Sequence, residues 1–184
     1  MPALNIKIFT TLFVAIFVTA TGAGFVAPLL PIYAHELGAG GFQIGLIFGA
    51  FSLTRTLFVS YFGKLSDRKG RKPFITTGLF LYFLVSLFYA VSDSVASLIL
   101  LRLGQGFASA MVLPVAQAYV GEMIPPNQEG RLMGLFNISL FGGLSAGPVM
   151  GGVLLDFFNF GTIFLSGAVV MALGTIMFWR DRQI

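Results

Sequence analysis

The segment GKLSDRKGRK, residues 63–72, is the most highly charged stretch of the sequence. Six of its ten residues are Asp, Lys or Arg, whereas only 10% of the 184 residues in the whole chain carry a charged side chain. The sequence on both sides is strongly apolar. The question is therefore why so apolar a chain gathers its charge at one place.

The composition places most of the chain in lipid. Hydrophobic residues make up 57% of the sequence, Phe alone occurs 21 times, and the mean hydropathy is +0.91. Soluble domains contain about 45–50% apolar and about 25% charged residues. A globule of this length has too few charged residues to cover so much apolar surface, so we predict a membrane protein.

Two further features of the composition exclude classes of function. Cys is absent, which excludes disulfides and Cys-based metal sites. The net charge of +4 and the pI of about 9.7 also occur in nucleic-acid-binding proteins, but basic loops that orient a membrane chain explain them better. We expect no nucleic acid partner, no metal and no cofactor.

The hydrophobic runs predict an all-α membrane protein with six transmembrane helices in a single domain, residues 1–184. Each run has about the 20 residues that a helix needs to cross the hydrocarbon core. The first run is too long for a signal peptide and is interpreted as an uncleaved helix. The six runs are residues 7–33, 42–62, 74–92, 95–121, 132–155 and 160–179.

The basic residues outside these runs or at their ends all fall on one predicted side of the membrane. They are Lys7, Lys64, Arg68, Lys69, Arg71, Lys72, Arg131, Arg180 and Arg182. The connecting segments on the other side contain no Lys or Arg. Since basic loops stay on the cytoplasmic side, we expect a multi-pass protein of the inner (plasma) membrane with both termini in the cytoplasm.

Orientation explains the positive charge of residues 63–72 but not an acidic residue among them or the two glycines that flank it. The segment resembles the G-x-L-x-D-R-x-G-R-[RK] loop between the second and third helices of the major facilitator superfamily. The alternative is an ordinary solvated run of charge. The matching residues are Gly63, Leu65, Asp67, Arg68, Gly70, Arg71 and Lys72.

The resemblance implies a fold and a function. The chain is similar to the amino-terminal six-helix half of such a transporter, which is a 3+3 inverted repeat, and most similar to the twelve-helix drug–proton antiporters. The expected function is transport of a small organic solute by alternating access, in the form of proton-coupled efflux. An enzyme is not expected, because the single His and seven scattered acidic residues offer no catalytic cluster.

The predicted first helix contains GAGFVAPLLP, residues 22–31, which places Gly22, Pro28 and Pro31 as in these antiporters. Proline removes a backbone donor and kinks a membrane helix. A kink without a further role is the simpler interpretation, and the two are compatible.

The predicted fourth helix contains RLGQGFASA, residues 102–110, which resembles the family's R-x-x-x-G motif through Arg102, Gln105 and Gly106. A charge inside the bilayer usually faces a cavity or a partner, although snorkelling to the interface is an alternative. Glu122 ends the same run. By resemblance, Glu122 forms a charge relay with Asp67 and Arg71 that holds the outward-facing state.

The predicted fifth helix contains GLSAGPVMGG, residues 143–152, which resembles the antiporter motif G-x-x-x-G-P-x-x-G-G. The corresponding residues are Gly143, Gly147, Pro148, Gly151 and Gly152. Glycines spaced by four form one helix face that lets another helix approach closely, so generic helix packing is the alternative. In the family this face packs against the other half, and we expect it to lack a partner within this chain.

The expected partners are the lipid bilayer, a small-molecule substrate, protons and a second six-helix half. The second half is a missing carboxy-terminal half, a separate chain or a second copy. A non-transporting or truncated bundle that serves as an assembly partner is the alternative function. Arg55 and Arg102, the only charges deep in the predicted helices, are candidates to meet an anion or an acidic residue of the other half.

Overall fold

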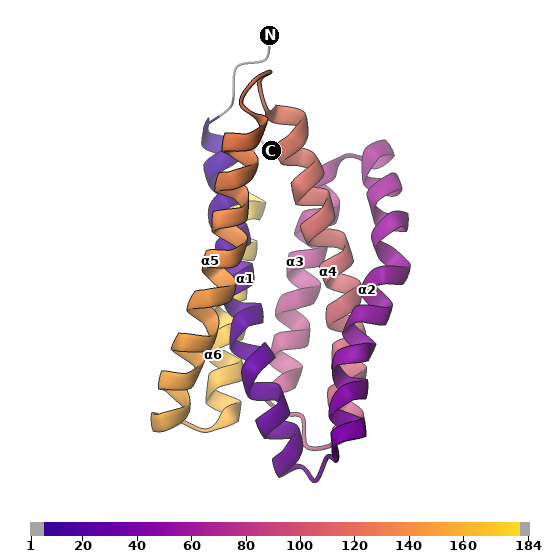
Figure 1. The fold of residues 1–184 in the computed structure, drawn as a ribbon, viewed down its shortest axis with the longest axis vertical. Coiled ribbons are helices and arrows are strands. Elements are labelled where there is room, and N and C mark those ends of the chain that lie inside the picture. Colours follow the sequence, from indigo (N-terminus) through magenta and orange to yellow (C-terminus); the bar gives the residue numbers. More distant parts are fainter. Residues whose placement is uncertain (1–5, 181–184) are drawn as a thin grey trace.

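A computed structural model describes residues 6–180, which form six helices long and apolar enough to cross a membrane (Figure 1). The helices are α1 Ile6–Glu36, α2 Gly41–Lys69, α3 Arg71–Tyr89, α4 Val95–Met123, α5 Glu129–Phe157 and α6 Phe160–Arg180. Arg182, which was counted among the cytoplasmic basic residues, lies outside the described residues.

The charged segment 63–72 is mostly helix and not the loop that the sequence predicted. α2 continues to Lys69, beyond the predicted end at residue 62, and α3 begins at Arg71. Only Gly70 separates them, with φ +91°, a conformation that favours glycine. Hydropathy marks only the part of a helix in lipid, whereas basic residues in the last turn of α2 suit the negative end of its dipole.

Contacts between the helices follow an internal twofold pattern. α1 packs mainly on α5 and α6, α4 packs mainly on α2 and α3, and α3 also packs on α6. Exchanging α1–α3 with α4–α6 reproduces this set of pairs, as expected of a 3+3 inverted repeat. Figure 1 shows the resulting groups, with α1, α5 and α6 on one side and α2, α3 and α4 on the other.

The connections alternate between the two ends of the bundle. The α2–α3 and α4–α5 connections lie at the upper end of Figure 1, and the other three lie at the lower end. Ile6 and Arg180, the first and last described residues, therefore also lie at the upper end. This end holds the basic residues of α2 from Lys64 to Lys69 and the first residues of α3.

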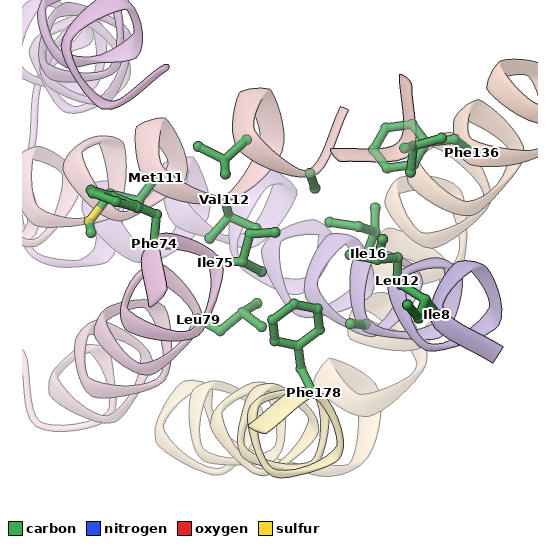
Figure 2. Close-up of a cluster of buried hydrophobic side chains, with 14 of the residues drawn as sticks. Ile8, Leu12, Ile16, Phe74, Ile75, Leu79, Met111, Val112, Phe136 and Phe178 are labelled. Atoms are coloured by element: carbon green, nitrogen blue, oxygen red, sulfur yellow. The ribbon is translucent and has the colours of Figure 1, made fainter. Parts of the chain in front are cut away.

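The largest cluster of buried apolar side chains joins all six helices near this charged end, with Phe62 as the buried member from α2 (Figure 2). Lipid is as apolar as these side chains, so helix association depends on close packing and not on a hydrophobic drive. The labelled members of the cluster are Ile8, Leu12, Ile16, Phe74, Ile75, Leu79, Met111, Val112, Phe136 and Phe178.

The glycine face of α5 packs on α1 within this chain, so the expectation that it lacks an intrachain partner is wrong. A Cβ on Gly147 would lie 2.5 Å from Cα of Gly24 in α1, and Gly143 is equally close to the backbone of Phe17. Gly151 lies against Phe25. Since this face is occupied, it no longer supports pairing of two copies through α5.

Four other residues of these motifs behave differently. A Cβ on Gly152 would meet nothing within 4 Å, so Gly152 takes no part in the crossing of α1 and α5. Gly22 lies against Met171 of α6. Pro28 and Pro31 lie inside the continuous helix α1, and the kink expected there stays a prediction.

Candidate functional site

The ends of three helices are connected by three charged residues. These are Asp67, Arg71 and Glu122, here called the charged cluster. Nη1 of Arg71 lies 2.5 Å from Oδ1 of Asp67 in α2, and Nη2 lies 2.5 Å from Oε1 of Glu122 in α4. Nε of Arg71 donates to the same Glu122 oxygen at 3.2 Å. Arg71 begins α3, where the helix dipole disfavours a cation, and the two carboxylates offset that effect.

Ser66 is a member of this site that the sequence analysis missed. Its buried hydroxyl accepts a hydrogen bond from Nη1 of Arg71 at 2.6 Å and donates to the Gly63 carbonyl at 2.7 Å. Ser66 therefore fixes the guanidinium against α2. The sequence feature that could have identified it is its spacing of four from Phe62, because residues so spaced share one helix face. Both side chains are buried.

The remaining residues of the segment are not gathered around Arg71. Leu65 packs against the large apolar cluster, whereas Arg68 is exposed. Lys72 is half-buried at the start of α3. Gly63 lies inside α2, and a Cβ there would meet nothing within 4 Å, so no contact in this structure requires glycine at that position.

A cavity of about 290 Å³ lies between α1, α2, α4 and α5, with one lining residue from α3, and it is here called the arginine cavity. Both arginines from the interior of the helices, Arg55 and Arg102, line it. No acidic side chain is among its lining residues. The residues that line the cavity are Thr19, Ala20, Ala23, Ala27, Phe48, Phe51, Arg55, Tyr82, Arg102, Gln105, Ser109, Val112, Leu113, Leu140 and Leu144.

Arg102 lies deep in the bundle and does not snorkel to the interface. Only 5% of the residue is exposed. Nη1 donates to Oε1 of Gln105 at 2.9 Å, and the same oxygen accepts a hydrogen bond from the buried Tyr89 hydroxyl at 3.2 Å. The rings of Phe48 and Phe51 in α2 lie 4.9 and 5.5 Å from the guanidinium carbon. The spacing of Arg102 and Gln105 places both on one face of α4.

Arg55 is half-buried on the α2 wall of the arginine cavity. No ion pair joins Arg55 or Arg102 to a carboxylate within residues 6–180. Gly106 lets α4 approach this part of α2 closely. A Cβ on Gly106 would collide with the Phe51 carbonyl and lie 3.2 Å from the backbone nitrogen of Arg55. Two cations thus share one cavity without a matching anion in the described chain.

Six membrane-length helices in two inverted triplets, with a cavity between them, define a half-bundle of the kind found in secondary transporters. The chain belongs to the Major Facilitator Superfamily, whose family model matches residues 12–183. This confirms the family and the fold class predicted from the sequence.

Two relatives show how much of a transporter the chain covers. An uncharacterised MFS-type transporter of Methanocaldococcus jannaschii is 36% identical over 181 residues, which are 94% of this chain and 47% of that protein. The quinolone resistance protein NorA of Staphylococcus aureus is 30% identical over 166 residues, which are 90% of this chain and 42% of NorA. The chain spans slightly less than half the length of these relatives.

Two solved structures share the fold. The human organic anion transporter MFSD10 (TETRAN) matches 94% of this chain and 46% of its own with a TM-score of 0.78 at 19% identity. The peptide transporter POT matches 95% of this chain and 37% of its own with a TM-score of 0.83 at 22% identity. The relatives are transporters and not enzymes, in agreement with the sequence analysis.

Proposed function

We propose that this chain acts as the amino-terminal half of a transporter that exports small organic solutes by alternating access. The observation that carries the proposal is the arginine cavity, which places two arginines between membrane-length helices. Charged residues in such a position usually mark a substrate or ion pathway. The likeness to NorA, a quinolone resistance protein, supports an amphipathic organic substrate.

We place the chain in the inner (plasma) membrane with both termini and the charged cluster on the cytoplasmic side. The basic residues of the connections support this orientation, since short loops rich in Lys and Arg are retained in the cytoplasm. The charged cluster then ties α2, α3 and α4 together at the cytoplasmic end. Its proposed role is to hold the outward-facing state.

A second six-helix half is the proposed partner of this chain. α2 and α5, which the inverted repeat relates to each other, are the least buried of the six helices. Both also contribute to the wall of the arginine cavity. A second half packed on α2 and α5 would close that cavity, as expected of a site at the interface of two repeats.

Proton coupling is proposed to depend on a group in the second half. Within residues 6–180, every acidic residue lies in a connection or near a helix end, as His35 does. A coupling group must bind and release protons within the membrane, and arginine does not lose its proton in proteins. The described helices therefore supply cations to the cavity and leave a titratable carboxylate to the partner.

Proton-dependent export is tested in everted membrane vesicles with a fluorescent quinolone. Two proteins are compared: the chain alone and the chain joined to the carboxy-terminal half of the M. jannaschii relative. We expect the joined protein to accumulate the quinolone when a proton gradient is imposed and to stop when a protonophore is added. The chain alone acts as the control for the requirement of a second half.

Accumulation that continues after the protonophore is added would contradict proton coupling but would still support transport. Absence of accumulation by both proteins, with normal membrane insertion, would contradict transport and favour the non-transporting assembly partner. Accumulation by the chain alone would identify a second copy as the partner half.

A further inference from the structure

We infer that the arginine cavity binds an amphipathic organic anion, with its carboxylate against Arg102. This assignment of a substrate class rests on the proposed transport function. It adds to that function the charge of the solute and the atoms that hold it.

The free edge of Arg102 is the first step of the argument. Nη1 is engaged by Gln105, but Nε and Nη2 are buried and have no hydrogen-bond partner within residues 6–180. Nε and Nη2 lie on the same edge of the guanidinium, and a carboxylate bridges such an edge with two parallel hydrogen bonds. Arg71 directs the same two nitrogens at a single oxygen of Glu122, so this chain already pairs this edge of a guanidinium with a carboxylate.

The surroundings of Arg102 restrict how an anion can approach. Phe48 and Phe51 lie against the guanidinium at 4.9 and 5.5 Å, and Gln105 takes the Nη1 side. The edge formed by Nε and Nη2 is therefore the part of the guanidinium that is left without a partner within residues 6–180. Because these donors are already buried, leaving them unpaired costs free energy that a carboxylate would recover.

The charge of the cavity favours an anion over a cation or a neutral solute. Arg55 and Arg102 both line it, and no Asp or Glu is among its lining residues. Two cations in an environment of low dielectric constant repel a third and attract an anion strongly. An organic cation would therefore find no counter-charge on this half of the site.

The size and the apolar lining define the rest of the ligand. The volume of about 290 Å³ is near the lower end of the range for small-molecule pockets. Ala23, Ala27 and Leu144 are among the apolar residues that line it. A flat body of one or two fused rings that carries one carboxylate matches both features.

The inference is tested by equilibrium dialysis of the purified chain in lipid nanodiscs against naphthoate and naphthamide. These probes have the same ring system and differ in charge, and empty nanodiscs correct for partition into lipid. We expect naphthoate to bind about tenfold more tightly than naphthamide, as for a buried bidentate charge pair. Arg102→Gln should abolish the preference, and Arg131→Gln, which removes an exposed arginine at the start of α5, should retain it.

Arg102→Lys covers the case in which Arg102→Gln fails to fold, as judged by its elution profile. Lysine keeps the charge but lacks the planar fork, so most of the preference should be lost. Equal binding of the two probes, or a preference that survives both Arg102 variants, would overturn the inference. An acidic residue of the second half would then be the counter-charge, and quinolone accumulation in the vesicle assay would remain as proposed.

Discussion

Replacing Gly147 by alanine is expected to destabilise the six-helix bundle by about 1–3 kcal/mol, the usual cost of overpacking a well-packed site. The new Cβ would lie 2.5 Å from Cα of Gly24 and 2.6 Å from the carbonyl oxygen of Thr21. Both are backbone atoms of α1, so the clash is relieved only if α1 and α5 move apart. The measurement is unfolding of the purified chain in detergent, followed by circular dichroism.

Gly152→Ala is the matched control on the same helix. A Cβ at this position meets nothing within 4 Å, so alanine adds no clash. Alanine is favoured over glycine in a helix interior by about 1 kcal/mol, and the control should therefore be neutral or slightly stabilising. Equal destabilisation by both substitutions would contradict the crossing of α1 and α5 described above.

Asp67→Asn is expected to reduce transport about fivefold while membrane insertion and folding stay normal. The Asp67 side chain is 56% exposed, and exposed ion pairs contribute at most about 1 kcal/mol to stability. That is too little to unfold the bundle. It is enough to shift an equilibrium between two transport states about fivefold, since 1 kcal/mol has that effect on an equilibrium constant. The measurement is quinolone accumulation by the joined protein in everted vesicles.

Two further substitutions extend this experiment: Glu129→Gln is a control, and Glu122→Gln is combined with Asp67→Asn in a double variant. Glu129 is an exposed carboxylate at the same end of the bundle, and its replacement should leave transport unchanged. Asp67 and Glu122 share one guanidinium, so the double variant Asp67→Asn with Glu122→Gln should show an effect that is not the sum of the two. Transport by Asp67→Asn at the rate of the unchanged protein would refute the proposed role of the charged cluster.

The sequence was sufficient for the number of helices, their order and the family, because long apolar runs and the residues around Asp67 are local patterns. Helix ends were less well predicted. Hydropathy falls at residue 62, but the backbone of α2 stays helical to Lys69, since charged residues are good helix formers outside the lipid.

Contacts between helices explain the rest of the differences. The spacing of Gly143, Gly147 and Gly151 predicted a close-packed face, but spacing does not tell which helix occupies it. The partner proved to be α1, where Gly24 supplies the matching small residue. Likewise, the spacing of Gln105 and Arg102 on one helix is enough to predict that the two side chains lie close together. Phe48, Phe51 and Tyr89 come from other helices and were not predicted.

The account depends most on the cytoplasmic position of the charged segment. The sequence contains no Cys, so a single cysteine introduced by Lys69→Cys or Asp93→Cys reports on one position alone. Both residues are exposed, and they lie at opposite ends of the bundle. With a membrane-impermeant maleimide, the Lys69→Cys variant should be labelled only in everted vesicles, and the Asp93→Cys variant only in intact cells. Labelling of the Lys69→Cys variant in intact cells would contradict the orientation and the proposed role of the charged cluster.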